Sequence, residues 1–224
     1  MSDAASDAAS DGPNAAPRVA LFDYGAGNLH SLVKALELAG ARVRVEADPA
    51  AAVRGADALV LPGVGAWGAA CERLAPGREA VRDAVAAGLP ALGICLGMQL
   101  LFEASDEGPG DGLGVLPGRV TRLRARRVPQ IGWNAVEPAD AGAPDALLAE
   151  SALGTAYYAN SFVCRPDAGA EGAVTAWSEH DGDRFPAAVR AGPAGAAVGV
   201  QFHPEKSSAP GLALVAAWVR GLGR

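Results

Sequence analysis

The sequence predicts an α/β fold with a central, mostly parallel sheet flanked by helices and an added antiparallel or mixed strand region. Residues 18–103 alternate between short apolar strands and helices, which is typical of parallel strands joined by helical crossovers. Residues 118–202 instead contain a series of short strand-like segments. We therefore expect the second half of the chain to extend the sheet of the first half.

The first half is expected to begin with a strand, a Gly-rich turn and a helix whose N-cap is Asn28. Leucines recur on one face of that helix. In order, the sequence predicts strand 18–23, helix 28–41, strand 42–46, helix 48–54, strand 56–61, helix 67–87, strand 91–95 and helix 96–103.

The second half is expected to contain strands 118–123, 130–136, 157–164, 174–178, 187–190 and 197–202, followed by a helix over 209–222. An arginine-rich run extends from Arg119 to Arg127 in this half. Two interpretations of it remain open: a solvated strand face, or a contact surface for an acidic partner.

Composition limits the class of protein. The chain has 224 residues and a formal net charge of −6, with 50% hydrophobic and 20% charged residues, as in globular proteins. Nucleic acid is not expected as a partner, because proteins that coat phosphates carry positive charge. The three cysteines and three histidines are too scattered for a zinc framework, and neither a metal nor a cofactor is expected.

The terminal residues and the cysteines indicate the domain organisation and the cellular compartment to expect. Residues 1–17 offer nothing to bury and are expected to be a disordered tail, which leaves residues 18–224 as one domain. The tail does not resemble a secretory signal, and no run of about eighteen apolar residues predicts a membrane span. Because the cysteines form no close pair, we expect a reducing compartment, the cytoplasm.

The motif Gly93-Ile-Cys95-Leu-Gly97 lies where an apolar strand runs into a helix. A nucleophile on such a turn is pushed out of the sheet, and the glycines on either side relieve crowding. The helix N-terminus stabilises a thiolate, and free backbone N–H groups nearby can bind an oxyanion. Cys95 is therefore the candidate nucleophile, whereas Cys71 and Cys164 lack this context.

A thiol nucleophile needs a base, and His203 is the candidate because it lies at the end of an apolar strand. Glu205 is two residues further on, so in an extended segment it projects from the same side and can orient the imidazole. A His-x-Glu spacing alone is a weak signal. Together with Cys95, it predicts a Cys-His-Glu triad.

A Gly-rich turn, Pro62-Gly63-Val64-Gly65, also follows a strand, and we name residues 62–65 the oxyanion loop. In open parallel sheets, ligands bind outside the carboxyl ends of the strands. Glycines there let backbone N–H groups turn inward. We expect Gly63, Val64 and Gly65, with the N–H of Leu96, to form an oxyanion hole.

These motifs carry a family resemblance. Residues 93–99 (Gly-Ile-Cys-Leu-Gly-Met-Gln) and 202–205 (Phe-His-Pro-Glu) resemble the signatures of the class I, triad-type glutamine amidotransferases. Segments 23–29, 61–66, 130–134 and 203–207 are similar to those of the glutaminase subunits of imidazole glycerol phosphate synthase. The resemblance spans about residues 18–222 and implies a flavodoxin-like fold of the class I amidotransferase type.

The resemblance implies that the substrate is L-glutamine, which is hydrolysed to glutamate and ammonia. Cys95 would attack the side-chain amide, His203 would carry the proton to the leaving ammonia, and Glu205 would hold His203. Backbone groups near Ser161 and Phe162 would help to bind the amino-acid end. The side chains expected to grip that end are Gln99 and Glu107.

The resemblance also implies a partner. Ammonia would pass to a separate cyclase subunit, a (β/α)8 barrel, within a heterodimer. The cyclase would make imidazole glycerol phosphate and aminoimidazole carboxamide ribotide in L-histidine biosynthesis. The positions that match the family's interface are Asn28, Trp133, Tyr157 and Lys206.

Three alternatives stay open at this point. The chain could be the glutaminase subunit of another synthase, such as those making pyridoxal phosphate or anthranilate. It could be a non-catalytic regulator with the same fold, although no triad residue is lost. The third alternative is a thiol hydrolase or peptidase of the same superfamily.

Overall fold

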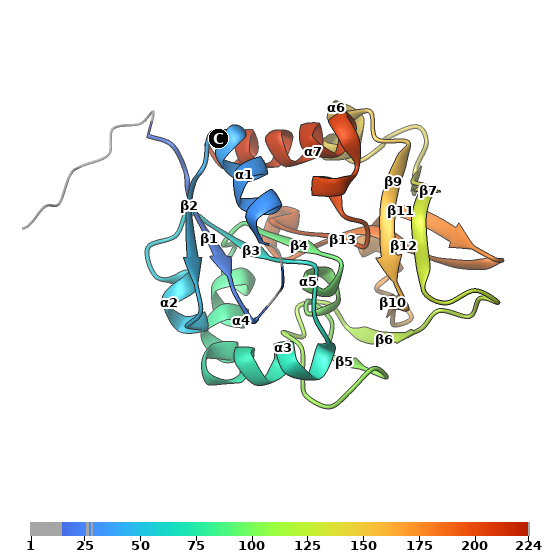
Figure 1. Ribbon diagram of the computed structural model, residues 1–224, viewed down its shortest axis with the longest axis horizontal. Coiled ribbons are helices and arrows are strands. Elements are labelled where there is room, and N and C mark those ends of the chain that lie inside the picture. Colours follow the sequence, from blue (N-terminus) through green and yellow to red (C-terminus); the bar gives the residue numbers. More distant parts are fainter. Residues whose placement is uncertain (1–14, 26, 28, 224) are drawn as a thin grey trace, which may run out of the picture.

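Within residues 15–25, 27 and 29–223, which the computed structural model describes, an eight-stranded sheet lies between two layers of helices (Figure 1). The five strands of its first part run parallel, and three further strands extend it in antiparallel fashion. In spatial order they are β2 (Arg42–Glu46), β1 (Arg18–Phe22), β3 (Ala58–Leu61), β4 (Ala91–Ile94), β13 (Ala197–Val200), β12 (Asp183–Ala191), β11 (Val174–His180) and β8 (Glu137–Pro138). The expected fold class is confirmed.

Helices cover both faces of this sheet (Figure 1). One layer contains α1 (His30–Leu38), α6 (Ala146–Ser151) and α7 (Ser208–Gly221), and the other contains α2 (Pro49–Val53), α3 (Trp67–Leu74) and α4 (Arg78–Ala86). A short helix, α5 (Leu96–Gln99), follows β4 directly. The 3-10 helices η1 to η4 span Ala75–Gly77, Glu171–Ala173, Pro193–Gly195 and Pro204–Lys206.

Successive side chains of the buried strands point to opposite faces of the sheet and form a hydrophobic core on each face. In β1, Val19 and Leu21 face the core beneath α1 and α7, whereas Ala20 and Phe22 face the core beneath α2, α3 and α4. All four side chains are buried, as expected of a strand covered on both faces.

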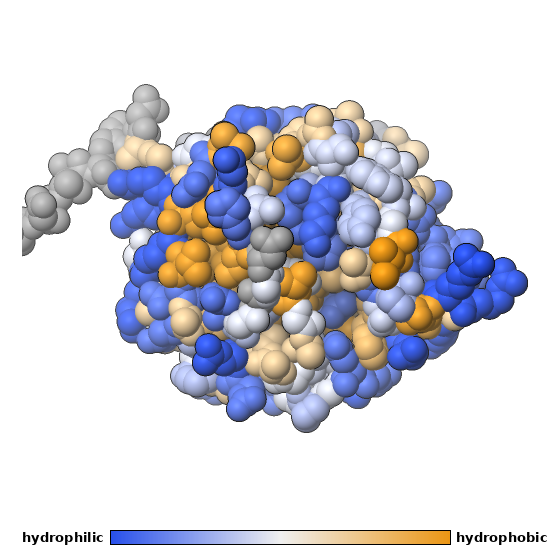
Figure 2. Space-filling model, in the orientation of Figure 1, coloured by the Kyte–Doolittle hydropathy of each residue, from blue (hydrophilic) through white to orange (hydrophobic). Residues whose placement is uncertain are grey.

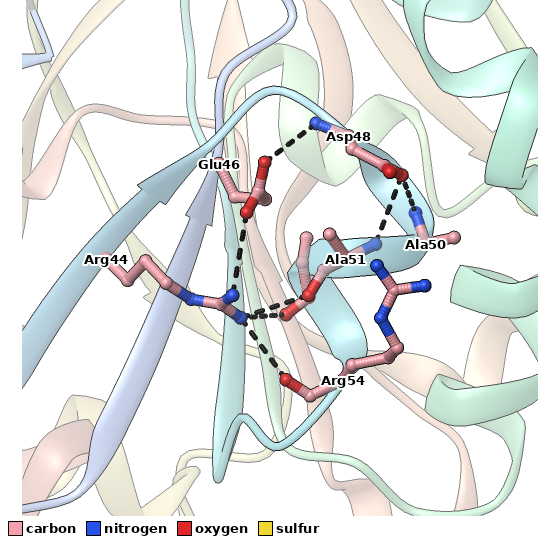
Figure 3. Close-up of polar contacts among 7 residues, drawn as sticks. Arg44, Glu46, Asp48, Ala50, Ala51 and Arg54 are labelled. Atoms are coloured by element: carbon pink, nitrogen blue, oxygen red, sulfur yellow. Dashed lines mark hydrogen bonds and ion pairs between the residues drawn. The ribbon is translucent and has the colours of Figure 1, made fainter. Parts of the chain in front are cut away.

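The short helix α2 is held by side-chain caps at both ends (Figure 3). Asp48 accepts hydrogen bonds from the N–H groups of Ala50 and Ala51 at the N-terminus. At the other end, Nη2 of Arg44 donates to the carbonyls of Ala51 and Arg54. Glu46 pairs with Arg44 and accepts from the N–H of Asp48, so one small network satisfies backbone groups that a five-residue helix leaves open.

Several strands that were expected to extend the main sheet belong instead to two small separate sheets. The predicted strand 157–164 is wrong as a single element, because the chain changes sheets at Ser161. Before it, β9 (Thr155–Asn160) pairs antiparallel with β7 (Gln130–Ala135). After it, β10 (Phe162–Pro166) joins a separate sheet with β6 (Gly118–Arg122) and β5 (Ala104–Ser105).

Three predicted helices are shorter than expected. The helix expected over 28–41 spans only His30–Leu38, with its N-cap at Leu29. The helix over 67–87 is interrupted at η1, where Pro76 removes a backbone donor. A Cβ atom on the adjacent Gly77 would lie 2.6 Å from the backbone nitrogen of Ala50, so the break also permits close packing on α2. The helix over 96–103 ends at Gln99, since the carbonyls of residues 100–102 accept from residues 113–115 instead.

The N-terminal expectations are only partly covered by the structure. Asn28 and residues 1–14 of the expected tail lie outside the described residues. Residues 15–17 have no regular secondary structure, but the carbonyl of Pro17 accepts from the N–H of Arg42 at 2.8 Å. In the part of the chain that the structure describes, no helix is both long and apolar enough to cross a membrane.

Candidate active site

The candidate site lies at the carboxyl ends of three adjacent parallel strands, β3, β4 and β13. Leu61 pairs with Gly93, and Ile94 pairs with Val200. The residues that follow each strand are therefore brought to one edge of the sheet: the oxyanion loop after β3, Cys95 after β4, and residues 201–205 after β13. This is where ligands bind in open parallel sheets.

Cys95 occupies a strained turn between β4 and α5. Its backbone has φ of 46° and ψ of −103°, which non-glycine residues rarely adopt. The turn also requires Gly97, because a Cβ atom there would lie 2.0 Å from the carbonyl oxygen of Leu61. The expected turn is thus present, with Cys95 held at the N-terminus of α5.

His203 and Glu205 are in contact. Nδ1 of His203 lies 2.9 Å from Oε1 of Glu205, and both side chains are largely buried. A carboxylate only accepts, so Nδ1 carries the proton and Nε2 is left to interact with Cys95. The reasoning from an extended segment is wrong, however, because β13 ends at Val200 and Glu205 lies in η4.

The charges around His203 favour its protonated form. Burial acts to lower the pKa of His203, but hydrogen bonds with the Cys95 and Glu205 side chains act in the opposite direction. The net result raises the pKa to about 9. The imidazole is therefore poised to hold a proton beside the thiol.

A cavity of about 280 Å³ opens beside Cys95 and His203. It brings together the expected nucleophile, base, oxyanion loop and glutamine-binding residues. Its walls are formed by Gly63, Val64, Gly65, Cys95, Leu96, Gln99, Glu107, Ala159, Asn160, Ser161, Phe162, His203 and Lys206. Glu205 lies behind it and lines a smaller neighbouring cavity with the oxyanion loop.

The oxyanion loop is packed tightly on the base. A Cβ atom on Gly63 would lie 2.9 Å from Cε1 of His203 and 3.0 Å from Cγ2 of Ile94. Gly65 has φ of 140°, a conformation that favours glycine. The two glycines are thus required for different reasons, space at 63 and backbone conformation at 65.

The far wall of the cavity is built on the side chain of Gln99. Its Nε2 donates to the carbonyl of Phe162 at 3.0 Å, and Nδ2 of Asn160 donates to the same carbonyl at 3.2 Å. The carbonyl of Ser161 accepts from the N–H of Leu123. These carbonyls therefore serve to hold the wall together.

Glu107 provides a carboxylate to the cavity. Burial raises the pKa of Glu107, and a hydrogen bond from the N–H of Trp67 to Oε2, at 3.4 Å, partly opposes this. A carboxylate at this place can accept hydrogen bonds from the ammonium group of an amino acid.

The expected interface residues lie outside the triad. Trp133 on β7 is 55% exposed and contacts Tyr157 on β9 edge to face, at 6.3 Å between ring centres. Ile131, on the same strand, is 68% exposed. Figure 2 shows hydrophobic side chains among hydrophilic ones over β7 and β9, at the right of the view. Lys206 reaches the cavity wall itself.

One residue of the site, Gln201, was not among those expected from the sequence. It is fully buried, and Nε2 lies 3.5 Å from Sγ of Cys95. The available signal was a polar residue directly after the apolar segment Ala197–Val200 and two residues before His203.

The fold and this site together define a class I glutamine amidotransferase. The chain belongs to that family, since the family model described as "Glutamine amidotransferase class-I" matches residues 20–218. Two solved structures share the fold of this chain. A "glutamine amidotransferase" crystal structure shares 22% identity, with a TM-score of 0.68 over 92% of this chain and 98% of that one. The structure of PurLQS from Thermotoga maritima shares 19% identity, with a TM-score of 0.67 over 92% and 99%.

Curated relatives identify the branch of the family to which the chain belongs. "Imidazole glycerol phosphate synthase subunit HisH" from Symbiobacterium thermophilum is 46% identical over 91% of this chain and 93% of its own length. The protein of the same name from Leifsonia xyli is 45% identical over 91% and 98%, and that from Halobacterium salinarum 44% over 88% and 90%. Within the amidotransferases, the chain belongs to this HisH family, and the expectation of an amidotransferase enzyme is confirmed.

Proposed function

We propose that the chain is the glutaminase subunit of an imidazole glycerol phosphate synthase and that residues 18–224 act as one amidotransferase domain. The observation that carries the proposal is the contact of Cys95, His203 and Glu205 at the edge of a cavity that also contains Gln99 and Glu107. The names of the relatives support the choice of synthase.

In this proposal, the thiol of Cys95 passes its proton to Nε2 of His203, and Sγ attacks the side-chain carbonyl carbon of L-glutamine. The oxyanion is bound by backbone N–H groups of the oxyanion loop and Leu96. His203 delivers its proton to the departing nitrogen, so ammonia leaves and a glutamyl thioester remains on Cys95. Water, deprotonated by His203, then hydrolyses the thioester and releases glutamate. The sum is glutamine plus water to glutamate plus ammonia.

The ammonia would pass to a cyclase subunit, where it enters imidazole glycerol phosphate. Ammonia in neutral water is mostly ammonium, which is a poor nucleophile, so an enclosed path between subunits preserves its reactivity. We propose that the cyclase binds over Trp133, Tyr157 and Lys206. Exposed aromatic side chains are typical of such interfaces. The thiol of Cys95 must stay reduced, which favours the cytoplasm.

The experiment is an assay of glutamate release by the full chain alone, with the cyclase subunit, and with the cyclase and its ribulosyl substrate. We expect little release by the chain alone and a large increase in the complete mixture. Cys95→Ala should abolish it, whereas Cys71→Ala is the matched control, because burial raises the pKa of the Cys71 thiol to about 11. Glutamate release by the Cys95→Ala variant would contradict the proposed chemistry. Release at the same rate with and without the cyclase would contradict the choice of partner.

A further inference from the structure

A buried glutamine lies between the nucleophile and the wall of the cavity. Gln201 follows β13 directly and is 0% exposed. Its backbone N–H donates to the carbonyl of Ala187 at 2.9 Å, and the N–H of Cys95 donates to the carbonyl of Val200 at 2.7 Å. Cys95 and Gln201 therefore leave neighbouring strands side by side.

The side chain of Gln201 makes two contacts. Nε2 lies 3.5 Å from Sγ of Cys95, and Oε1 accepts from Nε2 of Gln99 at 3.4 Å. The same nitrogen of Gln99 donates to the carbonyl of Phe162 at 3.0 Å. A continuous chain of hydrogen bonds thus runs from the cavity wall to the reactive sulfur.

The direction of this chain is fixed by one backbone group. A carbonyl oxygen can only accept, so the carbonyl of Phe162 requires the NH2 group of Gln99 to face it. That NH2 group then faces the carbonyl end of Gln201. The NH2 end of Gln201 is consequently turned toward Cys95 as a hydrogen-bond donor.

We propose that Gln201 is a positioning residue that holds the thiolate of Cys95 for attack and links it to Gln99, an inference that rests on the proposed role of Cys95. An N–H donor stabilises a negatively charged sulfur more than a neutral thiol. The contact also restricts rotation of Sγ, which sits on a strained backbone. Because burial excludes water from Gln201, no solvent molecule replaces the donor when it is removed.

The test compares Gln201→Met with the unaltered full chain. Methionine has a similar length and no donor. The first readout is the rate at which iodoacetamide alkylates Cys95 at neutral pH, located by peptide mass spectrometry, with Cys71 and Cys164 as internal references. Only a thiolate reacts, so this readout needs neither glutamine nor the cyclase. We expect the rate at Cys95 to fall about tenfold or more, as for the loss of one hydrogen bond to a charged group.

The second readout is steady-state glutaminase activity with the cyclase. We expect kcat to fall about tenfold and KM to change less than about threefold, since the Phe162 carbonyl still holds Gln99. Gln130→Met is the matched control: Gln130 is also buried but belongs to β7, and its variant should keep the original alkylation rate. Gln201→Asn, which keeps a buried amide but is one methylene too short for the sulfur, serves if Gln201→Met does not fold.

The proposal is overturned if a folded Gln201→Met or Gln201→Asn protein is alkylated at Cys95 at the same rate as the unaltered chain. The proposal is also overturned if KM alone rises, because Gln201 would then act on the pocket and not on the sulfur. If Cys95 in the unaltered chain reacts no faster than Cys71, there is no held thiolate and the proposal is wrong. Failure of the proposed function is distinguishable: Cys95 would react rapidly and respond to Gln201→Met, yet glutamine would not be hydrolysed.

Discussion

Gly63 and His203 are so close that a Cβ atom at position 63 would lie 2.9 Å from Cε1 of the imidazole. The oxyanion loop and the proposed base therefore pack directly on each other. The same Cβ atom would also lie 3.0 Å from Cγ2 of Ile94, so little free space remains between Gly63, His203 and Ile94. This contact couples the position of the loop to that of the triad.

Gly63→Ala should consequently displace His203 or the loop and lower kcat for glutamine hydrolysis by roughly tenfold to a hundredfold, as expected for small misplacements of catalytic groups. The control is Gly154→Ala, since Gly154 has open space around the added Cβ atom. Steady-state kinetics with the cyclase subunit would measure both. An unchanged kcat in a folded Gly63→Ala protein would show that the loop and the base are not coupled in this way.

The protonation of His203 should make stability depend on pH. Its pKa is raised from 6.5 to about 9, so the stabilisation by the protonated form is complete below pH 6.5 and is lost as the pH rises to about 9. The full effect is at most about 3 kcal/mol.

We expect the free energy of unfolding to fall across this window, and Glu205→Gln to reduce the slope because it removes one of the groups that raise the pKa of His203. Urea unfolding at several pH values would measure this. A slope in Glu205→Gln as steep as in the unaltered chain would mean that Glu205 does not stabilise the imidazolium.

Glu107→Gln should weaken glutamine binding without removing the chemistry. The amide keeps an acceptor for the N–H of Trp67 but loses the negative charge that would bind an ammonium group. We expect KM to rise about tenfold, in line with a hydrogen bond to a charged group, and kcat to stay within about twofold. Glu72→Gln on the exposed side of α3 is the control. A loss confined to kcat would place Glu107 in the reaction steps and not in binding.

Trp133→Ala should weaken association with the cyclase while leaving the isolated chain stable. More than half of Trp133 is exposed, so its replacement costs little free energy of folding. A tryptophan that is buried on binding often contributes about 2 kcal/mol or more to the binding free energy. We expect the Kd to rise more than about tenfold by calorimetry. Val45→Ala, at the exposed edge strand β2 far from β7 in Figure 1, is the control. Equal affinities would exclude β7 from the interface.

The arrangement of the triad was predictable because it depends on local patterns. The glycines around Cys95 indicate a tight turn between strand and helix, and parallel strands bring their carboxyl ends together. The same rule places His203 near Cys95. It does not give the detail at Glu205, which reaches His203 from the 3-10 helix η4 and not from an extended segment.

The parts that the sequence did not predict depend on distant contacts. The strand expected over 157–164 divides at Ser161 because its two halves pair with β7 and β6, which no local pattern specifies. A continuous helix was expected over 67–87, although Pro76 disfavours a helix interior, and no local pattern indicates the close packing of Gly77 on Ala50. The role of Gln201 has no local signal, because its partners, Cys95 and Gln99, lie more than a hundred residues away in the chain.

The most direct test of the account is detection of the glutamyl thioester. The full chain, mixed with the cyclase, its ribulosyl substrate and glutamine, would be quenched in acid during turnover, digested, and analysed by mass spectrometry. The account predicts a glutamyl adduct on the peptide that contains Cys95 and none on those that contain Cys71 or Cys164. Glutamate release with no adduct at Cys95, or with an adduct at another cysteine, would contradict it.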